Sequence, residues 1–472
     1  MKAVVREDRS PLVSVRVVLL AGSAADPPGR EGAAWVAAQM LAHGGTRRRT
    51  YKQILDFLFP RGADVRVSVD KEMTCFRMDC HAGHAEEMTD LLAEMLADPG
   101  WREEDFQRLR DDAIHYLEAD LRGENDEELA REALYGSVFE GHPYAHPCQG
   151  RTGALRRLTL DQVREFHTAE YSRANVILAC GGAGAERAAA RLRERLNGLP
   201  PQRRSGGDPP PPRPRPTNRM LFVEKPAQGV VISIGFPIDV RRGDDDYPAL
   251  LTAVSALGQH RMSSGRLFRS LRQQRGLNYG DYAYIEYFPA PMFLLEPEPN
   301  HARRRQIFEL WIRPVAREQA HFAVRLALYE LEKLAEGGLT EEEFDAARLF
   351  LSRHALLLEA SRSQQLGHEI DGLFYGTGLP SAWLRERLRA LAPEDVRRAV
   401  QRRLRPGAMQ FAFAGENLEQ LRRRILDNAP SPVEYNAPRP EAILREDREV
   451  SRRRIEVREE DARLLPAEAM FE

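Results

Sequence analysis

The chain has 472 residues, of which 42% are hydrophobic and 30% charged, with a net charge of −2 and a pI of about 6.7. This near-neutral balance excludes the global positive field that gathers nucleic acid or acidic lipid, so we expect no nucleic-acid partner. No stretch approaches the roughly 20 consecutive apolar residues that span a bilayer, so we expect no membrane segment. The length predicts two or three domains, and the hydrophobic content is enough for sizeable cores.

The first 20 residues alternate in polarity and lack a small-residue cleavage site, which predicts a strand and not a signal peptide. The four cysteines lack the spacing of a zinc ribbon or a disulfide framework, so we expect buried free thiols at Cys75, Cys80, Cys148 and Cys180. These features favour a cytoplasmic location, or a periplasmic one if a leader has been removed.

A segment rich in Pro, Gly and Arg, residues 198–217, cannot hold a packed element and marks a domain boundary. We predict an N-terminal domain over 1–200, a linker over 201–217 and a C-terminal domain over 218–430. Residues 431–472 form a charged extension that we expect to lie over the surface.

The two domains repeat one order of elements. In the first and second domain respectively, the expected elements are an opening strand (13–23; 229–238), a helix (30–41; 246–259), a helix leading into a hairpin (50–80; 265–298), a pair of helices (84–123; 321–361) and a capped helix followed by a strand (158–182; 391–415). The predicted fold is therefore α+β, with two homologous domains that each place helices on one face of a mostly antiparallel sheet.

The helix after the first strand reads GAAWVAAQMLAHGGT. It resembles the helix in which active members of the pitrilysin/insulinase family, which includes mitochondrial processing peptidase, hold the zinc motif H-x-x-E-H followed by G-T. The motif positions fall on Trp35, Ala38 and Gln39, and the best match to the family's later glutamate ligand is Glu118. Zinc catalysis needs neutral imidazoles, a carboxylate ligand and a base, and a lone carboxylate does not hold zinc tightly. The resemblance therefore implies a zinc-peptidase relative without a metal site of its own.

The segment RMSSGRLFRSLRQQRGLNYGDYAY resembles the part of the same family in which an arginine and, seven residues later, a tyrosine face the zinc across the cleft. Arg272 and Tyr279 match that spacing, and Arg269 and Arg275 are weaker candidates. We expect Arg272 near a helix end and Tyr279 beyond a break at Gly276, so that both side chains converge. A guanidinium and a phenol suit a substrate carbonyl and its developing oxyanion. The alternative is a solvated helix arginine beside an ordinary strand aromatic.

Two histidine pairs have spacings that a metal could bridge on a helix, His81 with His84 and His142 with His146. The first pair lies at an expected helix start, where polar caps are common, and the second lies in a loop containing Pro and Gly. We expect neither pair to bind metal. The acidic triplet 244–246 precedes a helix and complements its dipole.

The resemblance implies the non-zinc subunit of a heterodimeric zinc metalloendopeptidase that is inactive alone. A homologous partner would supply H-x-x-E-H and the zinc, this chain would supply Arg272 and Tyr279 in trans, and the substrate would be a peptide or an unfolded polypeptide. One alternative is a structural homologue, similar to the peptidase-like core subunits of a respiratory complex. Another is a homodimeric peptide-binding protein without chemistry.

Overall fold

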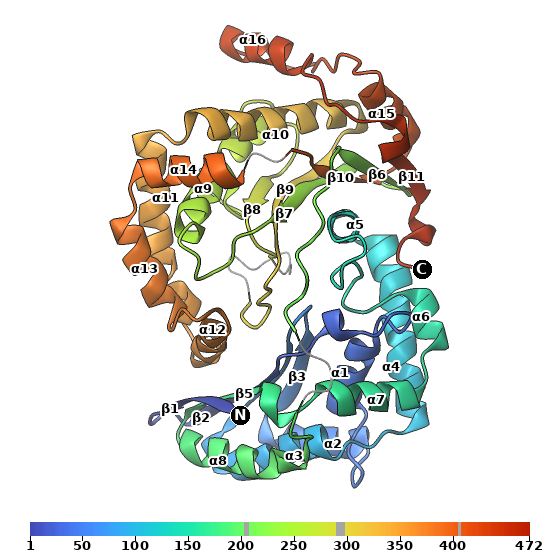
Figure 1. Cartoon of the computed structure of the whole chain (residues 1–472), viewed down its shortest axis with the longest axis vertical. Coiled ribbons are helices and arrows are strands. Elements are labelled where there is room, and N and C mark those ends of the chain that lie inside the picture. Colours follow the sequence, from blue (N-terminus) through green and yellow to red (C-terminus); the bar gives the residue numbers. More distant parts are fainter. Residues whose placement is uncertain (203–206, 289–297, 405–406) are drawn as a thin grey trace.

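The computed structural model describes residues 1–202, 207–288, 298–404 and 407–472 (Figure 1). Each half of the chain is built on one mixed, mostly antiparallel sheet. The first sheet contains β1 (Lys2–Glu7), β2 (Leu12–Leu19), β3 (Asp64–Val69), β4 (Thr74–His81) and β5 (Val176–Gly182). The second contains β6 (Arg219–Glu224), β7 (Val230–Ile238), β8 (Asp281–Tyr284), β9 (Gln306–Val315), β10 (Gln410–Gly415) and β11 (Ala462–Pro466).

The two sheets share one topology. Their orders are β1-β5-β2-β4-β3 and β11-β6-β10-β7-β9-β8, so five strands of the second sheet repeat the whole of the first. In both, the first strand of the repeat pairs in parallel with the last, and the remaining pairs are antiparallel. The predicted α+β fold of two homologous domains is confirmed.

Helices cover the sheets, and several begin with the predicted polar caps. Capping boxes start four of these helices, in which the side chain of Thr50, Thr159, Thr340 or Ser361 accepts a hydrogen bond from the backbone N–H group three residues later. In the first half the helices are α1 (Ala33–His43), α2 (Tyr51–Leu58), α3 (Ala85–Ala97), α4 (Glu103–His115), a π-helix (Tyr116–Glu124), α5 (Asp126–Val138), α6 (Thr152–Arg157), α7 (Leu160–Glu170) and α8 (Ala185–Arg195). In the second they are α9 (Tyr247–Gly258), a π-helix (Phe268–Gln273), α10 (Arg317–Gly337), α11 (Glu341–His354), α12 (Arg362–Tyr375), α13 (Pro380–Ala390), α14 (Pro393–Arg403), α15 (Leu418–Leu426) and α16 (Glu441–Val450).

One helix of each half packs on the sheet of the other half, which the sequence did not predict. Helix α5 packs on β7 and β10 of the second sheet, and α12 packs on β2 and β5 of the first (Figure 1). Leu366 and Ile370 of α12, for example, share an apolar cluster with Ile177 of β5. Strands β5 and β10 are buried along their whole length because both faces of each sheet are covered. The expectation of helices on one face only is therefore incomplete.

Buried ion pairs fix the two halves against each other. Arg303, just before β9, donates from Nε to Asp70 at 2.7 Å, and both side chains are buried. Burial raises the pKa of Asp70, but the Arg303 guanidinium outweighs it and holds that pKa well below its usual range. Arg131 of α5 lies 3.2 Å from Glu309 of β9, again within the core. Because breaking such a pair costs about 3–5 kcal/mol, the halves keep one arrangement.

Two expected elements differ from the structure. The return strand of the second hairpin, expected before residue 298, is β9 (Gln306–Val315), and residues 289–297 of the expected hairpin lie outside the described residues. The C-terminal extension does more than cover the surface, because β11 adds a parallel strand beside β6. Met470 and Phe471 are then buried in the core of the first half.

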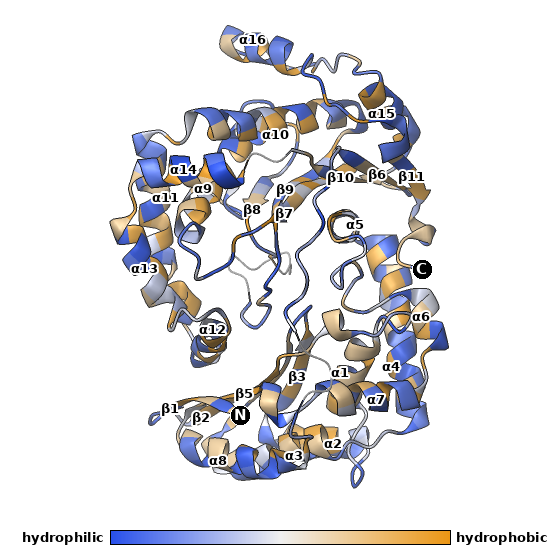
Figure 2. Cartoon of the chain, in the orientation of Figure 1, coloured by the Kyte–Doolittle hydropathy of each residue, from blue (hydrophilic) through white to orange (hydrophobic). Residues whose placement is uncertain are grey.

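Other expectations concern composition. All four cysteines are free thiols, as predicted; Cys75, Cys80 and Cys180 are buried as expected, whereas Cys148 is only half-buried. Figure 2 shows hydrophilic and hydrophobic residues mixed along the outer helices, such as α4 and α10, as expected for helices with one face on a core. Within the described ranges, we find no helix whose length and hydrophobicity would let it span a bilayer.

Candidate functional site

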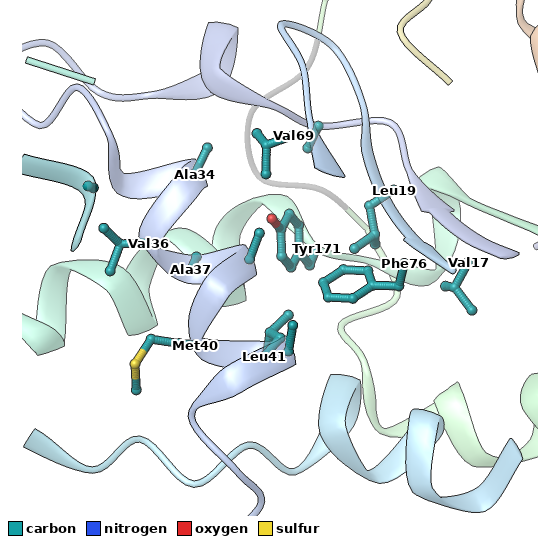
Figure 3. Packing of buried hydrophobic residues seen from close by; sticks show 14 of the residues in the cluster. Val17, Leu19, Ala34, Val36, Ala37, Met40, Leu41, Val69, Phe76 and Tyr171 are labelled. Atoms are coloured by element: carbon teal, nitrogen blue, oxygen red, sulfur yellow. The ribbon is translucent and has the colours of Figure 1, made fainter. Parts of the chain in front are cut away.

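Helix α1, which carries the degenerate motif, is held by packing. Asp26 caps its start by accepting bonds from the backbone N–H groups of Gly32 and Ala34, at 2.8 and 2.7 Å. The helix buries an almost continuous set of small and apolar residues, and Figure 3 shows Ala37 and Leu41 among the neighbouring buried side chains. The small side chains let α4, α7 and β3 approach closely. The surroundings of this helix are those of a core.

The motif positions on α1 hold no groups suited to zinc. Ala38 is fully buried and offers a methyl group, and half-buried Trp35 packs against the core of the first half. Gln39 is half-buried, and its Oε1 lies 2.9 Å from Nδ1 of His43. Burial, aided by the nearby charge of Arg108, lowers the pKa of His43. A methyl, an indole and an amide provide neither a ligand set nor a base.

Glu118 serves a different partner. It lies on the π-helix that continues α4, is exposed, and forms an ion pair with Arg156 of α6. Among the described residues, no group of three His, Cys, Asp or Glu side chains is arranged to hold a metal ion. The donor set at the motif positions does not fit zinc, so we derive no metal chemistry from this chain.

The two histidine pairs have local hydrogen-bonding roles. Nδ1 of His81 accepts from the backbone N–H of Gly83 and so caps a short 3-10 helix, as predicted for a helix start. His84 lies 2.7 Å from Glu87. His142 and His146 lie within 2.9 Å of the backbone oxygens of Pro210 and Pro147.

Arg272 and Tyr279 lie together at the turn between the second π-helix and β8. Nη1 of Arg272 donates to the backbone oxygen of Tyr279 at 2.8 Å, and its guanidinium lies 5.4 Å from the centre of the Tyr279 ring. Gly276, with φ of 70°, reverses the chain between them. Both side chains are exposed, Tyr279 to 76%. The strand begins at Asp281, two residues later than expected for Tyr279 at a strand start.

The arginines of this segment recur at every third residue, and three of the four pair with carboxylates. Arg266 and Arg269 contact Glu343 at 2.5 and 3.1 Å, and Arg275 pairs with residues of α16. Although burial raises the pKa of Glu343, its contacts with Arg266 and Arg269 lower that pKa to about 2. Arg272 has no carboxylate partner among the residues that the structure describes. Its charge is therefore the one in the series that is available to another molecule.

Sequence reasoning missed the anchoring of this turn. Arg275, considered above only as a weak second candidate, is completely buried and tied to α16. The signal for it was the acidic pair Glu446 and Asp447, 171 and 172 residues further along the chain, which nothing local connects to Arg275.

The fold and these positions define a two-domain protein of the metallopeptidase type whose motif helix carries no zinc ligands. Two sequence families match it: the one described as Insulinase (Peptidase family M16) over residues 2–151, and the one described as Peptidase M16 inactive domain over residues 157–351. The chain therefore belongs to the pitrilysin/insulinase-type M16 family.

Individual relatives have low sequence identity to this chain, but the similarity covers most of its length. An uncharacterized zinc protease of Streptomyces coelicolor is 23% identical over 385 residues, covering 80% of this chain and 79% of that protein. An uncharacterized zinc protease of Rickettsia felis is 22% identical over 402 residues, covering 81% and 88%. The solved structure of a peptidase M16 inactive domain from Pseudomonas fluorescens has a TM-score of 0.73 at 22% identity, covering 88% of this chain and 95% of that chain. A protease from Helicobacter pylori has a TM-score of 0.75 at 15% identity, covering 87% and 96%. These two structures share the fold.

Proposed function

We propose that this chain is the non-zinc subunit of a heterodimeric zinc metalloendopeptidase and supplies Arg272 and Tyr279 to the active site of its partner. The observation that carries the proposal is the exposed pair itself: a guanidinium without a carboxylate partner among the described residues beside a phenol that is 76% exposed. A cation and an aromatic side chain left in solvent, on a turn anchored on both sides, are suited to contact with another molecule.

The chemistry assigned to the pair is hydrogen-bond donation. Nη1 of Arg272 is used by the carbonyl of Tyr279, which leaves Nε and Nη2 to donate to a substrate. When a peptide carbonyl carbon becomes tetrahedral, negative charge grows on its oxygen. Donors aimed at that oxygen then bind the transition state more strongly than the ground state. The phenol of Tyr279 would supply a second donor to the same oxygen.

The partner in this proposal is a homologous chain with an intact H-x-x-E-H and its zinc. The substrate class is a peptide or an unfolded polypeptide. We expect an adjacent reading frame to encode such a chain, since the two subunits would act as one enzyme.

Reconstitution of the two purified chains tests the proposal. We expect neither chain alone to cleave a quenched fluorescent peptide library, the mixture to cleave it, and the pair to contain one zinc. Arg272→Ala and Tyr279→Phe should each lower kcat, by about 100-fold or more for the arginine. Arg269→Ala is the matched control, because Arg269 is an exposed arginine of the same segment that pairs with Glu343. Full activity of both variants would exclude the in-trans role.

The alternative is a structural or peptide-binding homologue without chemistry. The core packing around α1 favours it, because most residues of that helix are buried and stabilise the fold. The same reconstitution separates the two ideas. A stable complex in which Arg272→Ala changes nothing, or a homodimer that binds peptide without any zinc-bearing chain, would support the alternative.

A further inference from the structure

The C-terminal segment, residues 431–452, runs along the outer side of the second half before the chain returns as β11 (Figure 1). Its course is fixed on α10 by Arg325, a buried residue whose Nη1 donates to the hydroxyl of Ser431 at 2.9 Å and to the backbone oxygen of Ser451 at 2.6 Å. These two contacts hold both ends of a loop that contains α16. The helix is thereby placed beside the turn of Arg272 and Tyr279.

Arg275 is the point at which this segment holds the turn. Its side chain is 0% exposed; Nε lies 2.7 Å from Oδ1 of Asp447, and Nη2 lies 2.6 Å from Oε2 of Glu446. Nη1 donates back to the oxygen of Ser270 in the π-helix at 3.0 Å. The hydroxyl of Tyr435, in the same C-terminal segment, donates to the other oxygen of Asp447 at 2.7 Å. One guanidinium therefore joins the end of the π-helix to α16.

The anchored residue lies between the members of the proposed catalytic pair. Arg275 is three residues after Arg272 and four before Tyr279, and it directly precedes Gly276 with its left-handed backbone. The backbone N–H of Gly276 donates to the oxygen of Arg272, and that of Leu277 donates to Leu271. The side chains of Arg272 and Tyr279 are both exposed. The side chain that ties the turn to α16 is therefore the buried Arg275.

We propose that residues 431–452 are a positioning element, in which Glu446 and Asp447 hold Arg275 and thereby set the geometry of Arg272 and Tyr279. The effect on turnover rests on the function proposed above, whereas the effect on the order of the turn does not. Arg275, Glu446 and Asp447 are positioning residues and contact no substrate. Because a displacement of about 1 Å in a catalytic group can cost on the order of 100-fold in rate, loosening this anchor should be measurable.

The experiment uses a double variant that combines Glu446→Gln and Asp447→Asn in the full-length chain, and Glu441→Gln is the control for each single substitution. Glu441 lies on the same helix, and its substitution removes one negative charge, as each single substitution does, but its ion pair is with exposed Arg448. Hydrogen exchange followed by mass spectrometry should show residues 276–281 exchanging about tenfold faster or more in the double variant and unchanged in the control. The single variant Glu446→Gln provides a milder test if the double variant is unstable. Unchanged exchange at 276–281 in a folded variant overturns the positioning role.

Activity of the reconstituted pair supplies the second measurement. The double variant should lower kcat about tenfold, with a smaller change in KM, and the loss should vanish in the background of Arg272→Ala and Tyr279→Phe. A loss that persists in that background means general destabilisation and overturns the proposal. If Arg272→Ala and Tyr279→Phe are themselves harmless, the proposed function fails and with it the effect on turnover, while the exchange result still reports on the anchoring of the turn.

Discussion

The same turn occurs once in each half of the molecule, and the two copies have diverged in length and use. In the first half, Gly62 with φ of 56° follows a short helix, and a single residue separates it from β3, which begins at Asp64. In the second half, Gly276 with φ of 70° follows the π-helix, and four residues separate it from β8, which begins at Asp281. Tyr279 is one of those four residues. The longer copy therefore contains the residue for which we propose a function.

The difference shows how one fold can divide its tasks between repeats. Around the first turn, α1 fills the motif positions with core packing and leaves no donor for a metal. Around the second, carboxylates of α11 and α16 hold neighbouring arginines and leave Arg272 exposed. In this account the first half contributes stability and the second half contributes hydrogen-bond donors.

The largest expected effect is on stability and comes from the first half. Ala38→Glu restores one motif residue at a position that is 0% exposed. Because a buried carboxyl without a partner is costly, we expect the free energy of unfolding to fall by about 4 kcal/mol or more. Urea denaturation of the full chain, with Gln39→Glu at the half-buried neighbour as control, measures it. An unchanged midpoint would mean that the position opens into a cleft and not into a core.

A smaller effect is expected on pH dependence at the start of β8. Asp281 is buried, and burial raises its pKa to about 8 against the opposing influence of Asn278 and Arg313. The folded chain then keeps a proton that the unfolded chain releases above pH ~4, so stability is highest below that pH and falls as pH rises towards 8. Asp281→Asn cannot titrate, and at pH 8 we expect it to raise the free energy of unfolding by about 2–3 kcal/mol.

The equivalent first residue of β3 is the control for that prediction. Asp64 is half-exposed and pairs with Arg66 at 2.6 Å, so Asp64→Asn should leave the decline of stability between pH 5 and 8 in place. Denaturation curves across this range check both variants. A decline of the same steepness in Asp281→Asn would show that another group causes it.

The smallest effect is expected from the turn glycines. A residue with a Cβ costs about 1–2 kcal/mol in the left-handed region. At Gly62 a Cβ would meet no atom within 4 Å, and at Gly276 only a side-chain nitrogen of Arg439 at 3.8 Å, so Ala substitution at either position tests backbone strain alone. We expect similar small losses of stability from Gly62→Ala and Gly276→Ala, but a lower kcat of the reconstituted pair only from Gly276→Ala. Equal kcat values for the two variants would mean that the backbone of the second turn has no effect on catalysis.

Much of the fold follows from local patterns. The repeat could be predicted because alternating strands, capped helices and turn glycines occur in the same order twice, and the matching strand orders confirm it. The exchange of α5 and α12 between halves could not be predicted, because an amphipathic helix does not encode which sheet it will cover. Strand β11 was missed for a similar reason: ARLLP is short and mixed in polarity, and it is a strand through its pairing with β6.

The candidate site divides in the same way. The contact between Arg272 and Tyr279 agrees with the predicted convergence because helix, glycine and strand follow one another within a few residues. Their role in catalysis remains a prediction. The anchoring of Arg275 by Glu446 and Asp447 depends on a contact across about 170 residues of sequence, which no local pattern indicates.

The most direct test of the division between halves is the kcat of the reconstituted pair for two variants measured side by side. Arg272→Ala changes the turn in the second half, and Gln39→Ala changes a motif position in the first. We predict a fall of about 100-fold or more for Arg272→Ala and a change within about twofold for Gln39→Ala. A comparable fall for Gln39→Ala, or full activity for Arg272→Ala, would contradict the account.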